Sequence, residues 1–382
     1  MAAFFFLVSL CLGGVGVSGY LSVSHYRNFM DIGYQSFCAI SKALNCDTVS
    51  QSIYAVFFGV PLGVWGIAGY LVFLFFMAAL FPGKNKKTIQ AWAAGLFVIA
   101  AVFSGFSLFL AAIATFEIHS YCLMCIVLYG INFALLFISW LIWKRAGDGK
   151  RTGRLKNTVL FFREKISRIV LIGVGFLIVS GSLVLFYPKY WRFPELSASA
   201  GTGGSSGTTD EGSPWIGAEN PVLTIEEYAD YMCFQCGKMH GYLRKLVNQY
   251  PDKIRLVHRH FPLDNKVNPV LKENVHPNAG LVALFAIASE DTGMFWQAND
   301  LLFRDAREKK EINIKEIGEK LGLDVRQVNT MVYNAKTVSR LQADIRSGLK
   351  AGITATPSYI IDGTLYEGSI PVEILDRVVK EK

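Results

Sequence analysis

Hydrophobic residues in this chain gather into five long runs, each long enough to cross a lipid bilayer. A membrane-spanning helix needs about 20 consecutive apolar residues. The pattern therefore predicts an all-helical, membrane-embedded first half of the chain. The five runs cover residues 3–23, 55–81, 89–116, 121–143 and 169–187.

The first run has a second interpretation, because a secretory signal peptide also contains an apolar stretch. This run lacks the Lys or Arg flank of such peptides, and its glycines suit close packing between helices. We therefore favour a retained helix and keep cleavage as the alternative. The glycines are Gly13, Gly14, Gly16 and Gly19.

Beyond residue 190 the pattern changes to short strands and shorter helices. A strand leads directly into a helix, a second strand follows, and a helical stretch precedes two strands that are joined by a turn at Asp362-Gly363. This order predicts a soluble α/β domain with a helical insertion. Strands are expected at 222–230, at 253–261 and within 356–368, and helices at 231–250, within 274–350 and at 371–380.

A Gly/Ser/Thr-rich stretch without apolar periodicity, residues 197–214, separates the two halves and is expected to be flexible. The chain thus divides into four predicted parts. They are a transmembrane domain (1–145), a basic segment with the fifth span (146–190), a linker (191–218) and a soluble domain (219–382).

Composition and charge agree with a membrane protein. Hydrophobic residues make up 52% of the chain, which is too apolar for an ordinary soluble protein. The net charge of +8 comes largely from loops between spans, with nine Lys or Arg in 144–168 and three in 84–87. Basic loops stay in the cytoplasm. We therefore predict an inner-membrane protein with a cytoplasmic N-terminus, a periplasmic soluble domain and no nucleic-acid partner.

Six of the seven cysteines fall on the predicted outer side, where disulfides persist. Cys11 lies inside the first span and is expected only to pack. The six form three pairs, which predicts redox chemistry. The pairs are Cys38 and Cys46, Cys122 and Cys125, and Cys233 and Cys236.

Cys233 and Cys236 lie where a predicted strand hands over to a helix. The helix N-terminus favours a thiolate on the first cysteine, and the second, one turn later, can close a disulfide. Zinc binding is the alternative, with His240, His258 and His260 in the same domain, but no compact second ligand pair accompanies them. We therefore predict a dithiol/disulfide carrier and no metal.

The strand–Cys-Phe-Gln-Cys–helix unit, the helical insertion and Thr356-Pro357 resemble the thioredoxin superfamily, in particular its DsbA-like branch. The resemblance implies that the Thr356-Pro357 bond is cis, that it faces the cysteines and that it helps to hold the substrate peptide. Glu227 matches the acidic residue that such domains bury near the redox pair, and an exposed strand position is the alternative. Phe234-Gln235 replaces the Pro-His of strong oxidases and leaves the redox strength open.

The first 145 residues resemble the vitamin K epoxide reductase (VKOR) family. That family has a catalytic bundle of four helices, so the resemblance implies such a bundle here, joined by the fifth transmembrane helix. It also implies that the pair in the fourth helix is the active pair and that the loop pair is a shuttle, although a structural disulfide is the alternative for the loop. The matching motifs are Cys38-x7-Cys46, Cys46-x5-Ser52, Gly59-Val60-Pro61 and Cys122-x2-Cys125-x3-Tyr129.

Cys122 lies at the outer edge of the fourth apolar run and Cys125 lies one turn deeper, where we expect a lipid-soluble two-electron acceptor to reach it. A dithiol releases two electrons and two protons, as the reduction of a quinone requires. Ser52 and Tyr129 offer hydroxyls for a quinone oxygen or a thiolate. A helix cap and a packing aromatic are their respective alternatives. The vertebrate enzyme has an asparagine near the start of its second span, and the absence of an amide from "GVPLGVWG" favours quinone over epoxide as the substrate.

These features predict a membrane thiol oxidase that forms disulfides in exported proteins with reduced cysteines. Electrons would pass through Cys233/Cys236, Cys38/Cys46 and Cys122/Cys125 to the membrane quinone pool, either ubiquinone or menaquinone. One alternative is an outward-flowing reductase, which needs a thiol pair on the inner side. A second is a binding module on a membrane stalk, which would keep its activity without thiols.

Overall fold

The structure is a computed structural model that describes residues 2–31, 34–41, 43–81, 86–146, 159–192, 205–308, 312–323, 330, 332–371, 373–375 and 377. The chain forms two compact units, Met1–Tyr190 and Trp191–Lys382. We call them the membrane unit and the thioredoxin-like unit, and each is described by itself.

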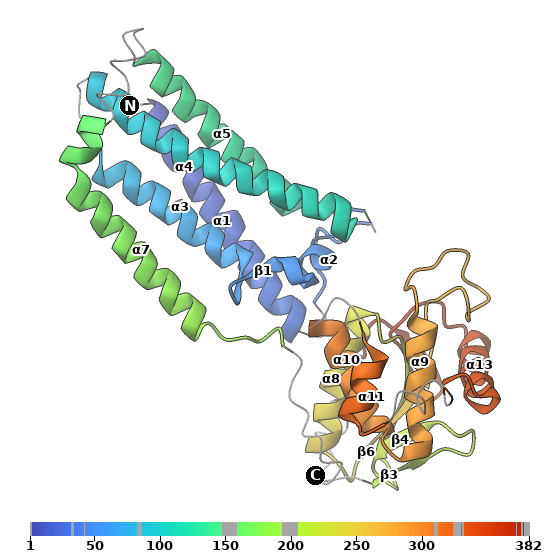
Figure 1. Ribbon diagram of the computed structural model, residues 1–382. Coiled ribbons are helices and arrows are strands. Elements are labelled where there is room, and N and C mark those ends of the chain that lie inside the picture. Colours follow the sequence, from blue (N-terminus) through green and yellow to red (C-terminus); the bar gives the residue numbers. More distant parts are fainter. Residues whose placement is uncertain are drawn as a thin grey trace. The chain divides into compact units, whose positions relative to one another are not determined.

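Long apolar helices make up the membrane unit (Figure 1). Five of them are long and apolar enough to cross a membrane, which confirms the five predicted spans. The helices are α1 (Ala2–Met30), α3 (Leu62–Ala79), α4 (Lys86–Ile113), α5 (Leu123–Arg145) and α7 (Ile166–Phe186).

Small residues bring α1 and α3 close together. A Cβ atom added at Gly14 would lie 2.5 Å from the ring of Tyr70, and one added at Gly63 would lie 2.8 Å from the backbone oxygen of Ser18. Helices approach this closely only where side chains are absent. Cys11 is fully buried in this core, together with Leu7, Tyr70, Phe73, Leu96 and Leu135.

The fifth span, α7, packs against the end of α3. Arg168 donates a hydrogen bond of 2.8 Å to the carbonyl oxygen of Ala79, and Ile169 and Ile172 pack against the bundle core. Lys84 and the basic positions between 147 and 158, which support the predicted orientation, lie outside the described residues.

The thioredoxin-like unit contains a six-stranded sheet in the order β3-β4-β6-β5-β7-β8. β5 and β6 are parallel, and the other neighbouring strands are antiparallel. The strands are β3 (Ser205–Thr208), β4 (Pro214–Gly217), β5 (Leu223–Ala229), β6 (Ile254–His260), β7 (Ser358–Ile361) and β8 (Thr364–Glu367).

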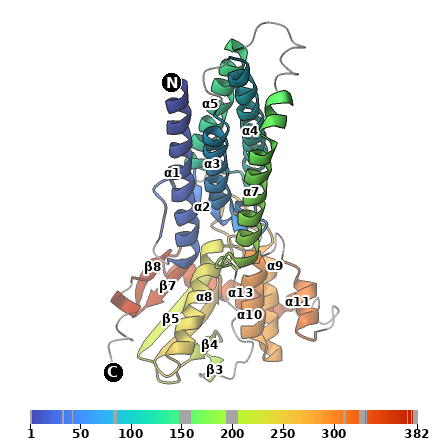
Figure 2. The same ribbon diagram turned by 90° about the vertical axis from the view of Figure 1, so that its left-hand side faces the viewer.

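Helices surround this sheet, and α8, which follows β5 directly, lies over it (Figure 2). The stretch between β6 and β7 is the predicted helical insertion. Asp362 and Gly363 both adopt positive φ, at 51° and 77°, in the tight turn that joins β7 to β8, as their sequence predicts. The helices are α8 (Phe234–Gln249), α9 (Ala279–Ala288), α10 (Phe295–Glu308), α11 (Ile314–Lys320) and α13 (Ala335–Lys350). Of the predicted last helix, only residues 373–375 and 377 are described as helical.

The last part of the predicted linker forms regular secondary structure, although the sequence predicts a flexible stretch there. Residues 205–217 form the β3–β4 hairpin, and β4 pairs with β6 so that Trp215 faces Val257. Trp215 also covers Gly207, and the guanidinium of Arg255 lies 4.3 Å from the centre of its ring. Backbone pairing, one aromatic residue and polar contacts, such as the ion pair between Glu211 and Arg259, hold this hairpin, so a search for apolar periodicity overlooks it.

Candidate active site in three cysteine pairs

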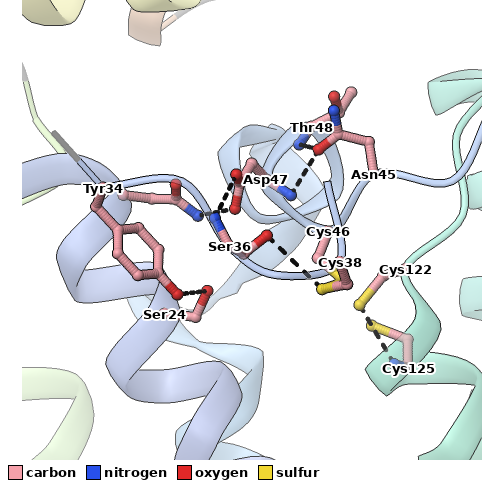
Figure 3. The surroundings of a disulfide bond; sticks show 11 residues. Ser24, Tyr34, Ser36, Cys38, Asn45, Cys46, Asp47, Thr48, Cys122 and Cys125 are labelled. Carbon is pink, nitrogen blue, oxygen red and sulfur yellow. Dashed lines mark hydrogen bonds between the residues drawn. A yellow bond between two sulfur atoms is a disulfide. The ribbon is translucent and has the colours of Figure 1, made fainter. Parts of the chain in front are cut away.

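The loop between α1 and α3 carries a disulfide bond between Cys38 and Cys46 (Figure 3). Cys46 begins the short helix α2 (Cys46–Gln51). The side chain of Asn45 caps this helix by accepting hydrogen bonds from the backbone N–H groups of Asp47 and Thr48, at 2.9 and 3.1 Å. The second cysteine of the pair therefore has a fixed place at a helix start.

Asp47 ties this loop to the bundle. Its carboxylate accepts hydrogen bonds from Asn28 Nδ2 of α1, at 3.0 Å, and from the backbone N–H of Ser36, at 2.9 Å. Only 8% of Asp47 is exposed, which strengthens bonds of this kind. The loop is thus docked on the membrane unit in this conformation.

The docked loop places the Cys38–Cys46 disulfide beside the Cys122/Cys125 pair. The backbone N–H of Asn45 donates to the carbonyl of Tyr121 at 2.9 Å, and Tyr121 donates to the carbonyl of Ala43 at 2.8 Å. Tyr121 immediately precedes Cys122, so these bonds place the loop beside the start of α5. Cys38, Cys46 and Cys122 form one buried cluster.

Cys122 occupies the N-cap position of α5, where its sulfur accepts a hydrogen bond from the backbone N–H of Cys125 at 3.3 Å. A hydrogen bond from the Cys125 thiol lowers the pKa of Cys122, with help from backbone N–H groups and against the effect of burial. Both cysteines of this pair are free thiols. Cys122 is therefore the better thiolate of the pair.

A cavity of about 90 Å³ lies next to this pair, and Cys46, Cys122, Cys125, Ser52 and Tyr129 contribute to its wall. Ser52 precedes a short 3₁₀ helix, but its side chain makes no capping hydrogen bond. Its hydroxyl donates instead to the carbonyl of Val49 at 2.8 Å, and its oxygen lone pairs remain acceptors. The residues that the sequence predicted for the membrane part of the site therefore line one cavity.

A second cavity of about 270 Å³ shares Cys125 and Tyr129 with the first and extends into the bundle. Its wall includes Asn132, Tyr70 and Ser107, which sequence reasoning did not identify. The available signal was the spacing of Cys125, Tyr129 and Asn132, which puts all three on one face of α5.

The pair in the thioredoxin-like unit repeats the geometry of the membrane pair. Cys233 is the N-cap of α8 and accepts a hydrogen bond from the backbone N–H of Cys236 at 3.2 Å. Its thiol lies 3.4 Å from the carbonyl oxygen of Thr356, and the Thr356-Pro357 bond is cis, as the resemblance implied. The predicted residues Thr356 and Pro357 therefore adjoin the redox pair.

Burial and hydrogen bonding separate the two thiols of this pair. Burial alone would raise the pKa of Cys233, but hydrogen bonds from the Cys236 thiol and backbone lower it below its ordinary value. Burial raises the pKa of Cys236 well above its ordinary value, and the neighbouring Cys233 adds to this. The surroundings therefore favour the thiolate on Cys233 and the protonated thiol on Cys236.

Glu227 is fully buried, so the exposed alternative for this residue is wrong. Its Oε2 lies 3.1 Å from His240 Nδ1 and 3.4 Å from His258 Nδ1. The other ring nitrogen of His240 lies 3.0 Å from Asp300, which also binds Arg244. We call these five residues the buried ion network.

The ion pairs within the buried ion network shift the pKa values of Glu227 and His240 against the effect of burial. Burial opposes the charge of Glu227, but His240 and His258 lower its pKa to about 2. Burial likewise opposes the charge on His240, but Glu227 and Asp300 raise its pKa. The network therefore favours the ionised carboxylate of Glu227 and the protonated ring of His240.

Donor atoms of Glu227, His240 and His258 lie within 4.8 Å of one another, close enough for a metal ion. Those atoms already bond to one another, and Asp300 occupies the remaining nitrogen of His240. Neither Cys233 nor Cys236 belongs to this group. We therefore interpret the group as an ion network rather than a zinc site.

Comparison with known proteins agrees with this geometry. The model of the "Vitamin K epoxide reductase family" matches residues 5–140, and the "Thioredoxin" model matches residues 209–381. Among curated proteins, the chain is 28% identical over 163 residues to Na(+)/H(+) antiporter NhaA 3 of Salinispora tropica and 26% identical over 164 residues to NhaA of Herminiimonas arsenicoxydans. Each match covers 43% of this chain but only 24% of the relative, so the antiporter names describe those proteins.

Solved structures with a similar fold include a thioredoxin-like oxidoreductase from Silicibacter pomeroyi, with a TM-score of 0.37 and 20% identity, covering 45% of this chain and 91% of that one. Another is the thiol-disulfide exchange protein alpha-DsbA2 from Wolbachia pipientis, with a TM-score of 0.36 and 21% identity, covering 44% and 86%. Residues 5–140 thus match the vitamin K epoxide reductase family and residues 209–381 match the thioredoxin family, so the chain joins a domain similar to the first to a domain similar to the second.

Proposed function

We propose that this protein oxidises thiols of exported proteins to disulfides and passes the electrons to a membrane quinone. One observation carries the proposal: Cys38, Cys46 and Cys122 are packed together, and Cys125 borders a cavity that runs into the bundle. A thiol relay therefore connects directly to a compartment that suits a lipid-soluble acceptor.

The relay begins in the thioredoxin-like unit, where a substrate thiolate attacks Cys233 of the Cys233–Cys236 disulfide. The second substrate thiol then attacks the mixed disulfide, and Cys233 leaves as a stabilised thiolate. The substrate is oxidised, and the carrier pair gains two electrons and two protons. The neighbouring Thr356 and Pro357 support an extended substrate peptide in this scheme.

The reduced carrier next transfers its electrons to the loop pair, and Cys46, which shares a cavity wall with Cys122, transfers them inward. Its thiolate attacks Cys122 of the Cys122–Cys125 disulfide and releases Cys125. Cys38 then attacks Cys46, which closes the loop disulfide and releases Cys122.

In the last step the Cys122/Cys125 dithiol becomes a disulfide again and the quinone becomes a quinol. Two electrons and two protons leave the dithiol, and one proton reaches each quinone oxygen. Tyr129 and Ser52 are the hydroxyl-bearing residues that we propose contact the quinone or the thiolate. Ubiquinone and menaquinone can both accept the two electrons and two protons.

We further propose that the protein resides in the inner membrane with a cytoplasmic N-terminus. The basic loops support this orientation, which places the Cys pairs and the thioredoxin-like unit outside the cytoplasm. The proposed parts follow the sequence: a catalytic domain of four helices to residue 145, a tether to 190, a linker whose end carries the β3–β4 hairpin, and the substrate-facing domain to 382.

The test uses the full chain in detergent with a reduced dithiol peptide and a water-soluble quinone, without oxygen. Quinone loss is followed by absorbance for the parent and for Cys125→Ala and Cys236→Ala. We expect reduction by the parent, no reduction by Cys125→Ala and at least a 100-fold slower reaction with Cys236→Ala.

Cys11→Ala is the matched control, because Cys11 is a lone buried thiol of the same membrane unit. It should retain the activity of the parent. A parent that leaves every quinone unreduced, although its Cys pairs exchange with the peptide, would contradict the proposed acceptor. Retention of activity by Cys125→Ala would contradict the proposed order.

A further inference from the structure

A buried carboxylate lies at the turn that leads into the redox pair of the thioredoxin-like unit. Asp230 follows β5 directly, and its side chain has no exposed surface. Its Oδ1 accepts a hydrogen bond from the backbone N–H of Met232 at 2.7 Å, and its backbone carbonyl accepts one from the N–H of Cys233 at 3.1 Å. Asp230 therefore shapes the turn that brings Cys233 to the start of α8.

The other oxygen of this carboxylate binds a histidine of the segment between β6 and α9. Asp230 Oδ2 lies 2.9 Å from Nδ1 of His276, and it also accepts a hydrogen bond from the backbone N–H of Leu263 at 2.7 Å. The backbone of His276 is fixed as well, because its N–H donates to the carbonyl of Leu263 at 3.0 Å and its carbonyl accepts from the N–H of Ala279 at 3.2 Å. The ring of His276 is thus held against the turn that precedes Cys233.

The charges of Asp230 and His276 act on Cys233 in opposite directions. Burial raises the pKa of Cys233 and a hydrogen bond from the Cys236 thiol lowers it, and of its charged neighbours Asp230 raises this pKa and His276 lowers it. A carboxylate in contact with an imidazole favours the protonated, positive ring. The Phe234-Gln235 dipeptide between the cysteines has no ionisable side chain, so positive charge reaches this pair from a residue farther along the chain.

We propose that His276 is a positioning residue of the Cys233–Cys236 pair, whose positive charge offsets the negative charge of Asp230 and stabilises the thiolate that Cys233 becomes on reduction. This inference rests on the proposed function and deepens it, because it assigns a residue to the redox strength of the carrier pair. The hydrogen bond to Asp230 holds the ring in place, and the charge of the ring acts on the sulfur of Cys233.

The balance of the exchange reaction shows how this charge sets the redox strength. The disulfide of the substrate forms while the Cys233–Cys236 bond breaks, and two electrons pass from the substrate to the pair. The two substrate thiols release two protons, of which one binds Cys236 and the other passes to solvent, so Cys233 remains a thiolate. A stabilised thiolate favours the reduced pair. The disulfide is therefore a stronger oxidant with the charge of His276 than without it.

The test measures how fast iodoacetamide alkylates Cys233 at a series of pH values in the reduced full chain in detergent. Fragment ions in mass spectrometry assign the label to Cys233 rather than Cys236. His276→Gln removes the charge and keeps a donor for Asp230. We expect the midpoint of its pH profile to rise by about 0.5 pH unit or more, as for loss of one nearby charge. At one fixed ratio of reduced to oxidised dithiothreitol, a smaller fraction of the variant's Cys233–Cys236 pair should be reduced.

Three further variants separate the effect of charge from an effect on the fold. His276→Arg restores a positive charge that can bind the same carboxylate, so its midpoint should return toward that of the parent. Asp230→Asn removes the opposing negative charge, so its midpoint should move to lower pH, whereas loss of a purely structural contact would shift the profiles of Asp230→Asn and His276→Gln in the same direction. Lys272→Gln is the matched control, because Lys272 is an exposed lysine of the same segment. It should leave the profile unchanged.

An unchanged midpoint in His276→Gln would overturn the inference, as would a His276→Arg variant whose midpoint rises as far as that of His276→Gln. If His276→Gln does not fold, Asp230→Asn decides, and a midpoint that stays or rises there overturns the inference. The measurement involves neither a quinone nor the loop pair. A parent that reduces no quinone would therefore contradict the proposed function and leave the pH profile of Cys233 readable, so the two failures are distinguishable.

Discussion

At the scale of single residues, the buried ion network is the most costly feature of the thioredoxin-like unit. Glu227, His240 and His258 have no exposed surface, and a charge without water is tolerated only when it is paired. Groups whose ionisation is displaced this far commonly lie near reactive groups. Here the network adjoins α8, whose first turn carries the redox pair, so it links the stability of the domain to pH.

Glu227 limits the stability of the domain at low pH, and His240 limits it at high pH. The pKa of Glu227 is depressed to about 2, so its contribution is present above its ordinary value of 4.5 and is lost as pH falls toward 2. The pKa of His240 is raised, so its contribution is present below its ordinary value of 6.5 and is lost as pH rises through the higher folded value. Together they favour stability between about 4.5 and 6.5.

We expect Glu227→Gln to lower the free energy of unfolding at pH 6 by about 3 kcal/mol, because it leaves His240 with one carboxylate fewer. The variant should also lose the part of the acid dependence that Glu227 contributes. The measurement is urea unfolding of the full chain, in which mass spectrometry detects the alkylation of Cys236 as this buried thiol becomes accessible.

Glu226→Gln is the matched control. Its half-exposed carboxylate pairs with Arg259 on the adjacent strand, and its loss should cost under about 1 kcal/mol. Equal losses in both variants would contradict the assigned role.

At the scale of elements, the two Cys-x-x-Cys pairs were predictable from their position at the start of a helix. Cys122 and Cys233 are both N-caps and both accept a hydrogen bond from the N–H three residues later, at 3.3 and 3.2 Å. This geometry follows from local spacing alone. The β3–β4 hairpin does not, because its bonds join Ser205–Thr208 to a strand whose own partner, β6, lies farther along the chain.

The proposed relay depends on the position of the loop that carries the Cys38–Cys46 disulfide. Asp47→Ala removes its hydrogen bonds to Asn28 and Ser36, a loss of about 1.5–3 kcal/mol for bonds to a charged group. The docked loop would then be populated less. We therefore expect quinone reduction driven by a peptide dithiol to slow about tenfold or more.

Direct reduction of Cys122–Cys125 by a small dithiol does not require the loop, so its rate should stay within about twofold of the parent. The readout is the ratio of the two rates in one preparation. Asp47→Asn keeps one acceptor oxygen, so its ratio of the two rates should lie between the ratio of the parent and that of Asp47→Ala. Equal slowing of both reactions would show that Asp47 acts on the fold of the bundle rather than on the docking of the loop.

At the scale of the whole molecule, the sequence predicted the cysteines of the site better than the surroundings of those cysteines. Reactive residues carry their own chemistry, so Cys125 and Tyr129 stand out in any apolar run. Tyr70, Ser107 and Asn132 do not, because their meeting depends on how α3, α4 and α5 rotate against one another. These helices are apolar on every side, so periodicity does not show which face is inward. Likewise, nothing local predicts that His240 and His258 converge on Glu227.

The proposed orientation in the membrane makes a prediction that involves the entire chain. Arg145 ends α5 on the predicted cytoplasmic side, and Val222, 52% exposed, precedes β5 in the thioredoxin-like unit. Cysteines introduced at these positions should differ in their access to a membrane-impermeant maleimide. Val222→Cys should be labelled on intact cells with the outer membrane opened, whereas Arg145→Cys should be labelled only after the inner membrane is disrupted. The parent chain supplies the background of native thiols. Labelling of Arg145→Cys before disruption would place the basic loops outside, and the thiol relay would then face the reducing cytoplasm, where a disulfide-forming oxidase cannot work.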